Sequence, residues 1–234
     1  PHDLSVVVDM FANDMAYEKA QIGDIALNAV YLPNPDGTHF VDSRLSHNEN
    51  EILILSGGYK EEEGVGSIDA GMELIEFPLS MANGFITDNL ALLEGFANAN
   101  LMVHGNIEQP FVNGWMSTRN ARIKSPSYSL DLKLQDDSIK ITNSHLNLDK
   151  LMVYSTGKNP LVFDGTVNFA DFERILLNLR VSANNFELTT AKRTQQASAY
   201  GKVYVDAFAM LIGDLSKNID IRGRLGVLGN TNVT

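Results

Sequence analysis

The sequence contains no cysteine in its 234 residues, so it has neither a disulfide framework nor thiol chemistry. Basic residues are also scarce: 18 Lys and Arg stand against 29 Asp and Glu, which gives a formal net charge of -11. This balance argues against binding to nucleic acid, whose phosphates attract basic residues, and against docking on anionic lipid head groups. We attribute most of the acidity to solubility.

Long hydrophobic runs are missing as well. No apolar stretch reaches the roughly 18 residues that a membrane-spanning helix needs, and no basic-then-apolar start marks a signal peptide. The chain opens at Pro1 and stops at Thr234 directly after a strand-like run. We therefore expect residues 1–234 to be a single β-rich segment cut from a longer protein, in which the lack of targeting signals carries little weight.

The sequence does contain a two-residue alternation that returns along the whole chain. Its clearest instance spaces apolar residues at Val203, Val205, Ala207, Ala209 and Leu211. Successive side chains of a β-strand point to opposite faces, so each such run predicts a strand with one apolar face. Turn-forming residues separate the runs at about the 8–12-residue spacing that is typical of all-β domains.

Two stretches depart from this alternation. Val6–Val8 predicts a strand, whereas the mixed spacing of Met10–Ala20 also fits a short helix. From Pro78 to Phe96 the apolar period lengthens, which predicts one or two short helices near 78–95 that end at Gly95. We expect this part, 78–96, to be a helical insertion or a cap.

Asparagine and glycine punctuate the second half of the chain. Asn113-Gly114 and Ala183–Asn185 predict breaks between strands. A loose recurrence of apolar-x-apolar-x-Gly ends at Gly105, Gly165 and Gly223, which indicates a solenoid-like stack of similar strands.

Candidate catalytic and metal-binding residues are few. The five histidines show no metal-ligand spacing, and His104 and His145 alternate with apolar neighbours, so both should point outward. No nucleophile elbow, phosphate-binding loop or zinc-protease motif is present. We expect no enzyme activity, no cofactor and no metal. An enzyme or glycan-binding β-helix would need a cluster on one outer face, for which the candidates are Asp131, Asp137, Asp149 and Trp115.

The apolar face of so many strands has two possible fates. In a β-sandwich or a closed barrel it is core. In a long curled sheet this face lines an open trough. With neighbouring strands about 4.8 Å apart, about fifteen strands would give a trough roughly 70 Å long. Soluble proteins rarely expose such a surface, so the trough would need a lipid or another hydrophobic partner.

Several segments resemble the C-terminal region of the TamB family, the translocation-and-assembly-module proteins related to the AsmA-like group. The likeness extends over roughly residues 20–234 and is strongest after residue 95. It includes a stretch similar to members from the Bacteroidota, Phe77–Gly95. The other segments are Asn100–Gly105, Pro160–Val167, Leu177–Phe186, Tyr200–Ala207 and Gly223–Thr234.

This resemblance implies a β-taco, an elongated sheet curled into a U-shaped hydrophobic groove. It implies a periplasmic protein anchored in the inner membrane, working with an Omp85-type outer-membrane partner, without cofactor or catalytic residues. The implied function is movement of phospholipid to the outer membrane and support of outer-membrane biogenesis. The residues expected to face acyl chains are Leu130, Leu132, Leu134, Ile139, Ile141, Leu146, Leu148, Val167, Ile175, Leu177, Leu179, Val181, Phe186, Leu188, Val203, Val205, Leu225 and Val227.

A second hypothesis uses the edges of the sheet rather than its face. A scaffold or chaperone could assemble outer-membrane proteins by strand pairing, without conducting lipid. An exposed edge strand also predicts edge-to-edge self-association of an isolated segment. The two hypotheses differ in whether charges on the apolar face or changes at the edge abolish function.

Overall fold

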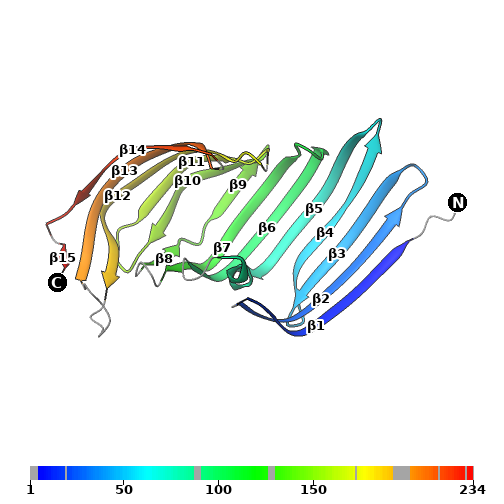
Figure 1. Ribbon diagram of the computed structural model, residues 1–234, viewed down its shortest axis with the longest axis horizontal. Coiled ribbons are helices and arrows are strands. Elements are labelled where there is room, and N and C mark those ends of the chain that lie inside the picture. The colour runs from blue at the N-terminus through cyan, green and yellow to red at the C-terminus, as the bar shows by residue number, and fades with distance from the viewer. Residues whose placement is uncertain are drawn as a thin grey trace.

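The computed structural model describes residues 5–18, 20–86, 91–125, 130–171, 173–191, 201–215, 217–229 and 231–233. It contains strands β1 to β15 and one short 3-10 helix, η1 (Figure 1). Their bounds are β1 Val6–Tyr17, β2 Ala20–Pro33, β3 Thr38–His47, β4 Asn50–Glu62, β5 Val65–Pro78, η1 Leu79–Phe85, β6 Leu92–Asn106, β7 Phe111–Ser125, β8 Leu130–Leu134, β9 Ser138–Thr142, β10 His145–Tyr154, β11 Leu161–Asn168, β12 Leu176–Ala191, β13 Gly201–Asp214, β14 Ile219–Val227 and β15 Asn232–Val233.

The strands form one antiparallel sheet in which neighbours in sequence are mostly neighbours in space. Its order is β1-β2-β3-β4-β5-β6-β7-β8-β10-β11-β12-β13-β14, with β9 paired to β7 and β10, and β15 paired to β13. The short strands β8 and β9 pair with different parts of β7. Among the described strands, β1 and β14 each pair on one side only, so the sheet is open and the closed alternative is wrong.

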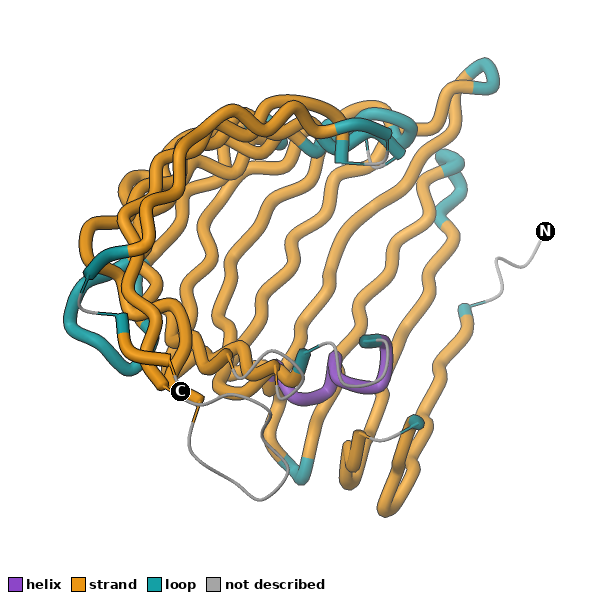
Figure 2. The backbone as a smooth tube through the Cα atoms, turned by 60° about the vertical axis from the view of Figure 1, so that its left-hand side comes forward, coloured by secondary structure: helices purple, strands orange, loops and turns teal. Residues whose placement is uncertain are grey.

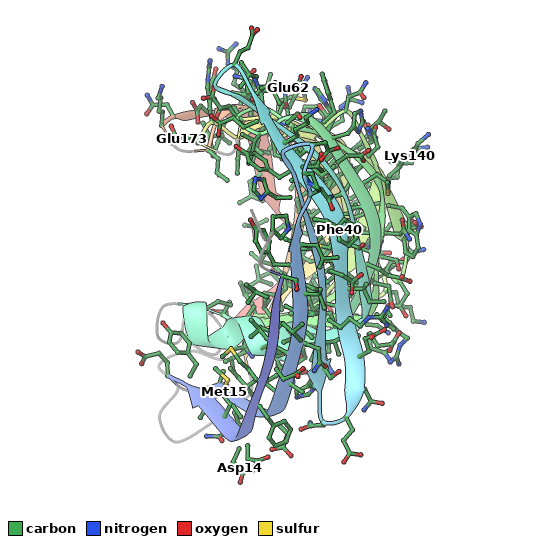
Figure 3. The ribbon with its side chains drawn as sticks, turned by 90° about the vertical axis from the view of Figure 1, so that its right-hand side faces the viewer. Asp14, Met15, Phe40, Glu62, Lys140 and Glu173 are labelled. Atoms are coloured by element: carbon green, nitrogen blue, oxygen red, sulfur yellow. The ribbon has the colours of Figure 1, made fainter. Side chains whose placement is uncertain are left out.

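The sheet curls along its length into an elongated trough (Figure 2). Seen from its end it has a C-shaped section, and η1 lies on the inner side of one lip (Figure 3). This architecture confirms the predicted curled, mostly β fold.

The predicted helical segment is shorter than expected. η1 ends at Phe85, residues 87–90 lie outside the described part of the chain, and β6 has begun at Leu92. Gly95, the expected helix stop, is therefore a strand residue. In the described part of the chain, no helix is long and apolar enough to cross a membrane.

The amide side chain of Asn83 connects η1 to the first residues of strand β6 through two hydrogen bonds. Its Nδ2 donates to the Leu93 carbonyl at 3.0 Å, and its Oδ1 accepts from the Leu93 amide at 2.7 Å. The other side of η1 contacts the first strands, because a Cβ on Gly84 would lie 2.6 Å from the ring of Tyr17. η1 thus bridges β6 and the end of β1.

The helical alternative for Met10–Ala20 is wrong, because β1 continues to Tyr17 as a strand. Its pairing with β2 runs from Val6 opposite Tyr31 to Tyr17 opposite Ala20. The apolar spacing of this stretch is mixed because the register shifts between Ala12 and Met15. A bulge adds a residue to one strand, so it interrupts the two-residue period that the sequence would otherwise show.

Two of the predicted breaks between strands lie inside strands. Asn113 and Gly114 lie within β7, where the pairing with β6 stays in register, whereas Ala183–Asn185 forms a bulge inside β12. Asn185 has a φ of 49°, in the left-handed region that asparagine tolerates, and its amide donates to Asp206 Oδ1 at 2.7 Å. Asn185 is therefore a strongly bent residue, and the partner strand decides between a turn and a bulge there.

The same kind of hydrogen bond, from the amide of a left-handed residue to an Asp or Asn side chain, recurs along the sheet. At four other residues with left-handed φ, the amide donates to an Asp or Asn side chain 2.8–2.9 Å away. The pairs are Asp14 with Asp24, Glu76 with Asn98, Asn120 with Asp136, and Asn143 with Asn113. Asn143 lies in the turn between β9 and β10, whereas Asp14, Glu76 and Asn120 lie at bulges, which bend strands and increase their twist. We attribute part of the curl of the sheet to these side-chain-supported bends.

The bulge at Glu76 joins three strands through its carboxylate. Asn98 on β6 donates to Oε1 at 3.1 Å, and Arg119 on β7 donates to Oε2 at 2.8 Å. The hydrogen bond from Arg119, and secondly that from Asn98, hold the pKa of Glu76 below its ordinary value of 4.5. The charged form therefore stabilises the fold above about pH 4.5, and this stabilisation is lost as the pH falls through the lowered pKa.

Replacing Glu76 should give a pH-dependent loss of stability. We expect Glu76→Gln to lower the urea midpoint at pH 7 by a small amount, and we expect this difference to shrink as the pH falls through the lowered pKa of the wild-type carboxyl. Urea denaturation at a series of pH values measures this, with Glu73→Gln, an exposed glutamate of the same strand, as control. A midpoint difference that does not change with pH would contradict the assignment.

The glycine at the end of one recurring apolar-x-apolar-x-Gly unit, Gly165, is required by the backbone. It has a φ of 132°, and a Cβ on it would lie 2.2 Å from the carbonyl oxygen of Asn178 on β12. We expect Gly165→Ala to lower the free energy of unfolding by at least about 2 kcal/mol, from strain and strand displacement. Gly226→Ala is the matched control, because the nearest atom to its Cβ is 3.9 Å away. Equal urea midpoints for the two variants would contradict this account.

Candidate functional site

The register of the sheet assigns every strand residue to one of two faces. Lys140 points to the outer, convex side (Figure 3), so its neighbours Ile139 and Ile141 point to the inner, concave side. Directly opposed residues of paired strands share a face. We call the side that carries Ile139 and Ile141 the inner face and the other side the outer face.

The predicted acyl-facing residues gather on the inner face. Ile141 opposes Leu146, which opposes Val167, and Val167 in turn opposes Leu177. The same register places all but two of the set there. The exceptions are Ile175, which precedes β12, and Leu188, which lies at a bulge between Glu187 and Thr189. The in-register members are Leu130, Leu132, Leu134, Ile139, Ile141, Leu146, Leu148, Val167, Leu177, Leu179, Val181, Phe186, Val203, Val205, Leu225 and Val227.

The inner face continues into the first half of the chain, which the sequence prediction did not include. Val103 opposes Val112 on β7 and Ala70 on β5, and Ala70 opposes Gly57 on β4. Farther along, Leu45 opposes Leu53 on β4 and Leu27 on β2. The alternation of Ile25, Leu27, Ala29 and Tyr31 was visible in the sequence and could have identified this part.

The two faces differ sharply in charge. Among the register-paired positions of the inner face in the described strands, Glu61 is the one Asp, Glu, Lys or Arg side chain. The outer face carries cross-strand ion pairs instead, such as Arg122 with Asp131 at 2.5 Å and Lys124 with Glu94 at 2.5 Å. The inner face is therefore mostly apolar and almost free of charged side chains from β1 to β14, whereas the charged side chains lie on the outer face.

Inner-face side chains are exposed to solvent on the two edge strands and are buried at some positions between them. Leu225 and Val227 on β14 are 66% and 64% exposed, and Met10 on β1 is 60% exposed. In contrast, Phe186 and Val205 are each 2% exposed. Apolar surface that remains open to solvent on a folded chain indicates a site for a hydrophobic partner.

A pocket of about 460 Å³ hollows the inner face over β2 to β5, where Val41, Leu55, Ile68 and Ala70 contribute apolar lining. Gly57 also lines it, and a Cβ there would lie 2.3 Å from the Cβ of Ala70. Glycine at this position thus lets β4 and β5 approach closely, and it adds no side chain that would fill the pocket.

Three rings lie at the same pocket: Tyr31, His39 and Tyr59. The Tyr31 hydroxyl and His39 Nδ1 are 2.6 Å apart, and their rings stack at 5.8 Å between centroids. Burial, followed by the nearby charge of Glu61, raises the pKa of Tyr59 above its usual value. Sequence patterns did not reveal this cluster, although the Asn34–Gly37 turn fixes the hairpin that brings Tyr31 and His39 together.

The residues considered for an enzyme or a glycan site do not converge. Asp131 pairs with Arg122, Asp137 accepts from the Ser138 amide at 2.7 Å, and Asp149 is exposed. Trp115 is exposed on the outer face, opposite Asn100. Within the part of the chain that the structure describes, no group of three or more His, Asp or Glu could hold a metal ion.

The two histidines that were predicted to point outward, His104 and His145, lie on the outer face. His104 is directly opposite Phe111, and the two rings are 5.7 Å apart. His145 Nδ1 lies 2.8 Å from the carbonyl oxygen of Asn143. Neither residue joins the inner face.

Comparison with known proteins gives one relevant similarity. A segment of 110 residues, 47% of this chain, is 28% identical to the translocation and assembly module subunit TamB of Haemophilus influenzae. The alignment covers 8% of that protein, so this chain spans a small part of its relative's length. No protein-family model and no solved structure matches the chain. The similarity agrees with the resemblance of the sequence to TamB and AsmA-like proteins.

Proposed function

We propose that this chain is a groove segment of an envelope protein that conducts phospholipid toward the outer membrane and supports outer-membrane biogenesis. The observation that carries the proposal is the mostly apolar and almost uncharged inner face, which runs from β1 to β14 and is open to solvent at both ends. Removing one acyl CH₂ from water is worth about 0.8 kcal/mol, so such a face can shield lipid tails through an aqueous gap. With few polar groups to fix a ligand, lipid can slide along it.

The cellular setting is part of the same proposal. The resemblance to TamB-like proteins suggests a periplasmic, C-terminal segment of Bacteroidota type, in a protein anchored in the inner membrane. It also suggests an Omp85-type outer-membrane protein as the partner. We propose that the role is non-enzymatic and needs no cofactor, because lipid movement along an apolar track breaks no covalent bond.

Site-specific photo-crosslinking in cells tests the proposal. A photoreactive amino acid at Leu179 or Val41, both on the inner face, should give phospholipid adducts that mass spectrometry detects in the purified protein. The same probe at the adjacent outer-face positions, Arg180 and Asp42, is the matched control. Phospholipid adducts at equal yield from both faces, or from neither, would overturn lipid conduction.

The unpaired edges of the sheet favour a second candidate function. β1 and β14 each present a free edge among the described strands, and the β14 residues Ile221 and Leu225 are exposed. Such an edge can accept a further strand. A scaffold or chaperone that pairs with nascent outer-membrane strands would give protein adducts, rather than lipid adducts, from probes on β14. The same edge would let two copies associate.

A further inference from the structure

The ring cluster of Tyr31, His39 and Tyr59 is an exception to the mostly apolar inner face. The three side chains come from β2, β3 and β4, and His39 is directly opposite Tyr59. The ring centroids of His39 and Tyr59 are 6.3 Å apart. Tyrosine and histidine have an apolar body and a polar tip, so they suit a boundary between an oily surface and water.

The cluster and the pocket form one continuous site. Its volume of about 460 Å³ falls within the range of small-molecule binding sites, which combine an apolar lining with a few placed polar groups. Val41, Leu55 and Ile68 supply the apolar lining, and the rings supply the polar groups. A site of this kind fits a molecule with an apolar chain at one end and a polar group at the other.

Hydrogen-bonding capacity remains at the rings. When the Tyr31 hydroxyl donates to His39 Nδ1, the proton of the neutral imidazole is on Nε2. Nε2–H can then donate to a phosphate or ester oxygen. The Tyr59 hydroxyl donates to Glu61 Oε2 at 3.3 Å, which connects the rings to the rim of the groove.

The rim beside this site is acidic. Glu61 ends the inner-face row of β4, and Glu62 lies at the tip of the β4–β5 hairpin (Figure 3). Lys60 is occupied by Glu62, with 2.5 Å between Nζ and Oε1, which leaves Glu61 and Glu63 without a basic partner among the described ion pairs. Negative charge here favours a ligand with a positive group and opposes a purely anionic head group.

We propose that this site is a head-group station for a zwitterionic phospholipid that carries a primary ammonium. One acyl chain occupies the pocket, the rings contact the phosphate and ester region, and the ammonium pairs with the Glu61 carboxylate. The tyrosine faces add cation–π attraction for the same group. The station rests on the proposed function and deepens it, because it makes one place on the groove selective by head-group charge.

The test is a competition measured by native mass spectrometry on the purified protein. Phosphatidylethanolamine and phosphatidylglycerol with identical acyl chains are added in equal amounts. We expect wild type to prefer the ethanolamine lipid about tenfold, as one charge-assisted contact would give. Glu61→Gln should bring the ratio close to one, whereas Glu63→Gln, its matched control in the adjacent turn, should retain the preference.

Two further variants separate the head group from the tail. His39→Phe keeps an aromatic ring and should lower the binding affinity for both lipids about fivefold, as expected for the loss of one hydrogen bond. Val41→Trp should fill the pocket and lower the binding affinity for both lipids without changing the ratio in which they bind. Circular dichroism confirms that each variant retains its sheet.

The outcomes distinguish this inference from the proposed function. Wild type that binds both lipids equally would overturn the station and leave the conduit standing, as would equal head-group ratios in Glu61→Gln and Glu63→Gln. Wild type that binds neither lipid would overturn both.

Discussion

Cells whose only copy of the protein carries Leu179→Asp should lose outer-membrane function while the protein remains folded. Leu179 lies in the middle of the inner face, opposite Gly165 on β11 and Leu211 on β13. It is half-buried, and Gly165 has no side chain, so water can reach a carboxylate at this position in the empty groove. An acyl chain passing over it would strip that water, at a cost of several kcal/mol.

We therefore expect lipid passage to fall by at least about a hundredfold, which corresponds to roughly 3 kcal/mol. The readouts are the phospholipid content of the isolated outer membrane and the sensitivity of cells to detergent. Asn178→Asp is the matched control, because it adds the same charge to the adjacent, exposed position on the outer face. Normal outer-membrane phospholipid in cells with folded Leu179→Asp protein would count against conduction and favour the scaffold.

Val205→Glu should instead prevent stable folding of the C-terminal strands. Val205 is 2% exposed and lies directly opposite Phe186, which is equally buried. A carboxylate there has no basic partner on the inner face of the described strands. We expect a loss of about 3–5 kcal/mol in the free energy of unfolding, a large part of the stability of an ordinary domain.

The matched control for this change is its direct cross-strand neighbour. Val227 opposes Val205 on the edge strand β14, shares the inner face and is 64% exposed. Val227→Glu should change the free energy of unfolding by no more than about 0.5 kcal/mol, because the added carboxylate stays in water. Urea denaturation followed by circular dichroism compares the two. Similar midpoints for both variants would contradict the burial of the Val205 side chain.

The faces of the strands could be predicted because their signal is local. Side chains alternate with a period of two whatever the partner strand is. The sequence alone therefore predicted that Leu177, Leu179 and Val181 lie on a common face. Whether this face is sealed or open depends on whether another layer covers it, which no single run encodes. The family resemblance, rather than the alternation, favoured the curled sheet that the structure confirms.

Irregular positions could not be predicted because they depend on a distant partner. Asn185 lies in a bulge and not in a turn because β12 pairs with β13 on both sides of it, and Asp206 on β13 accepts its amide hydrogen. The segment after Met10 is a strand only because β2 pairs with it.

The pocket was missed for a related reason. Tyr31, His39 and Tyr59 are unremarkable singly and become a cluster through the register of two hairpins. The residues that bend the sheet and those that mark its polar site are therefore the ones whose role sequence patterns do not reveal.

The most direct test of the central claim is native mass spectrometry with lipid extraction on the purified protein. We predict that wild type and Asn178→Asp carry phospholipid through purification and that Leu179→Asp does not. A lipid-free wild-type protein that also ignores added fluorescent phospholipid would contradict an acyl-binding inner face and would make strand pairing at the sheet edge the better account.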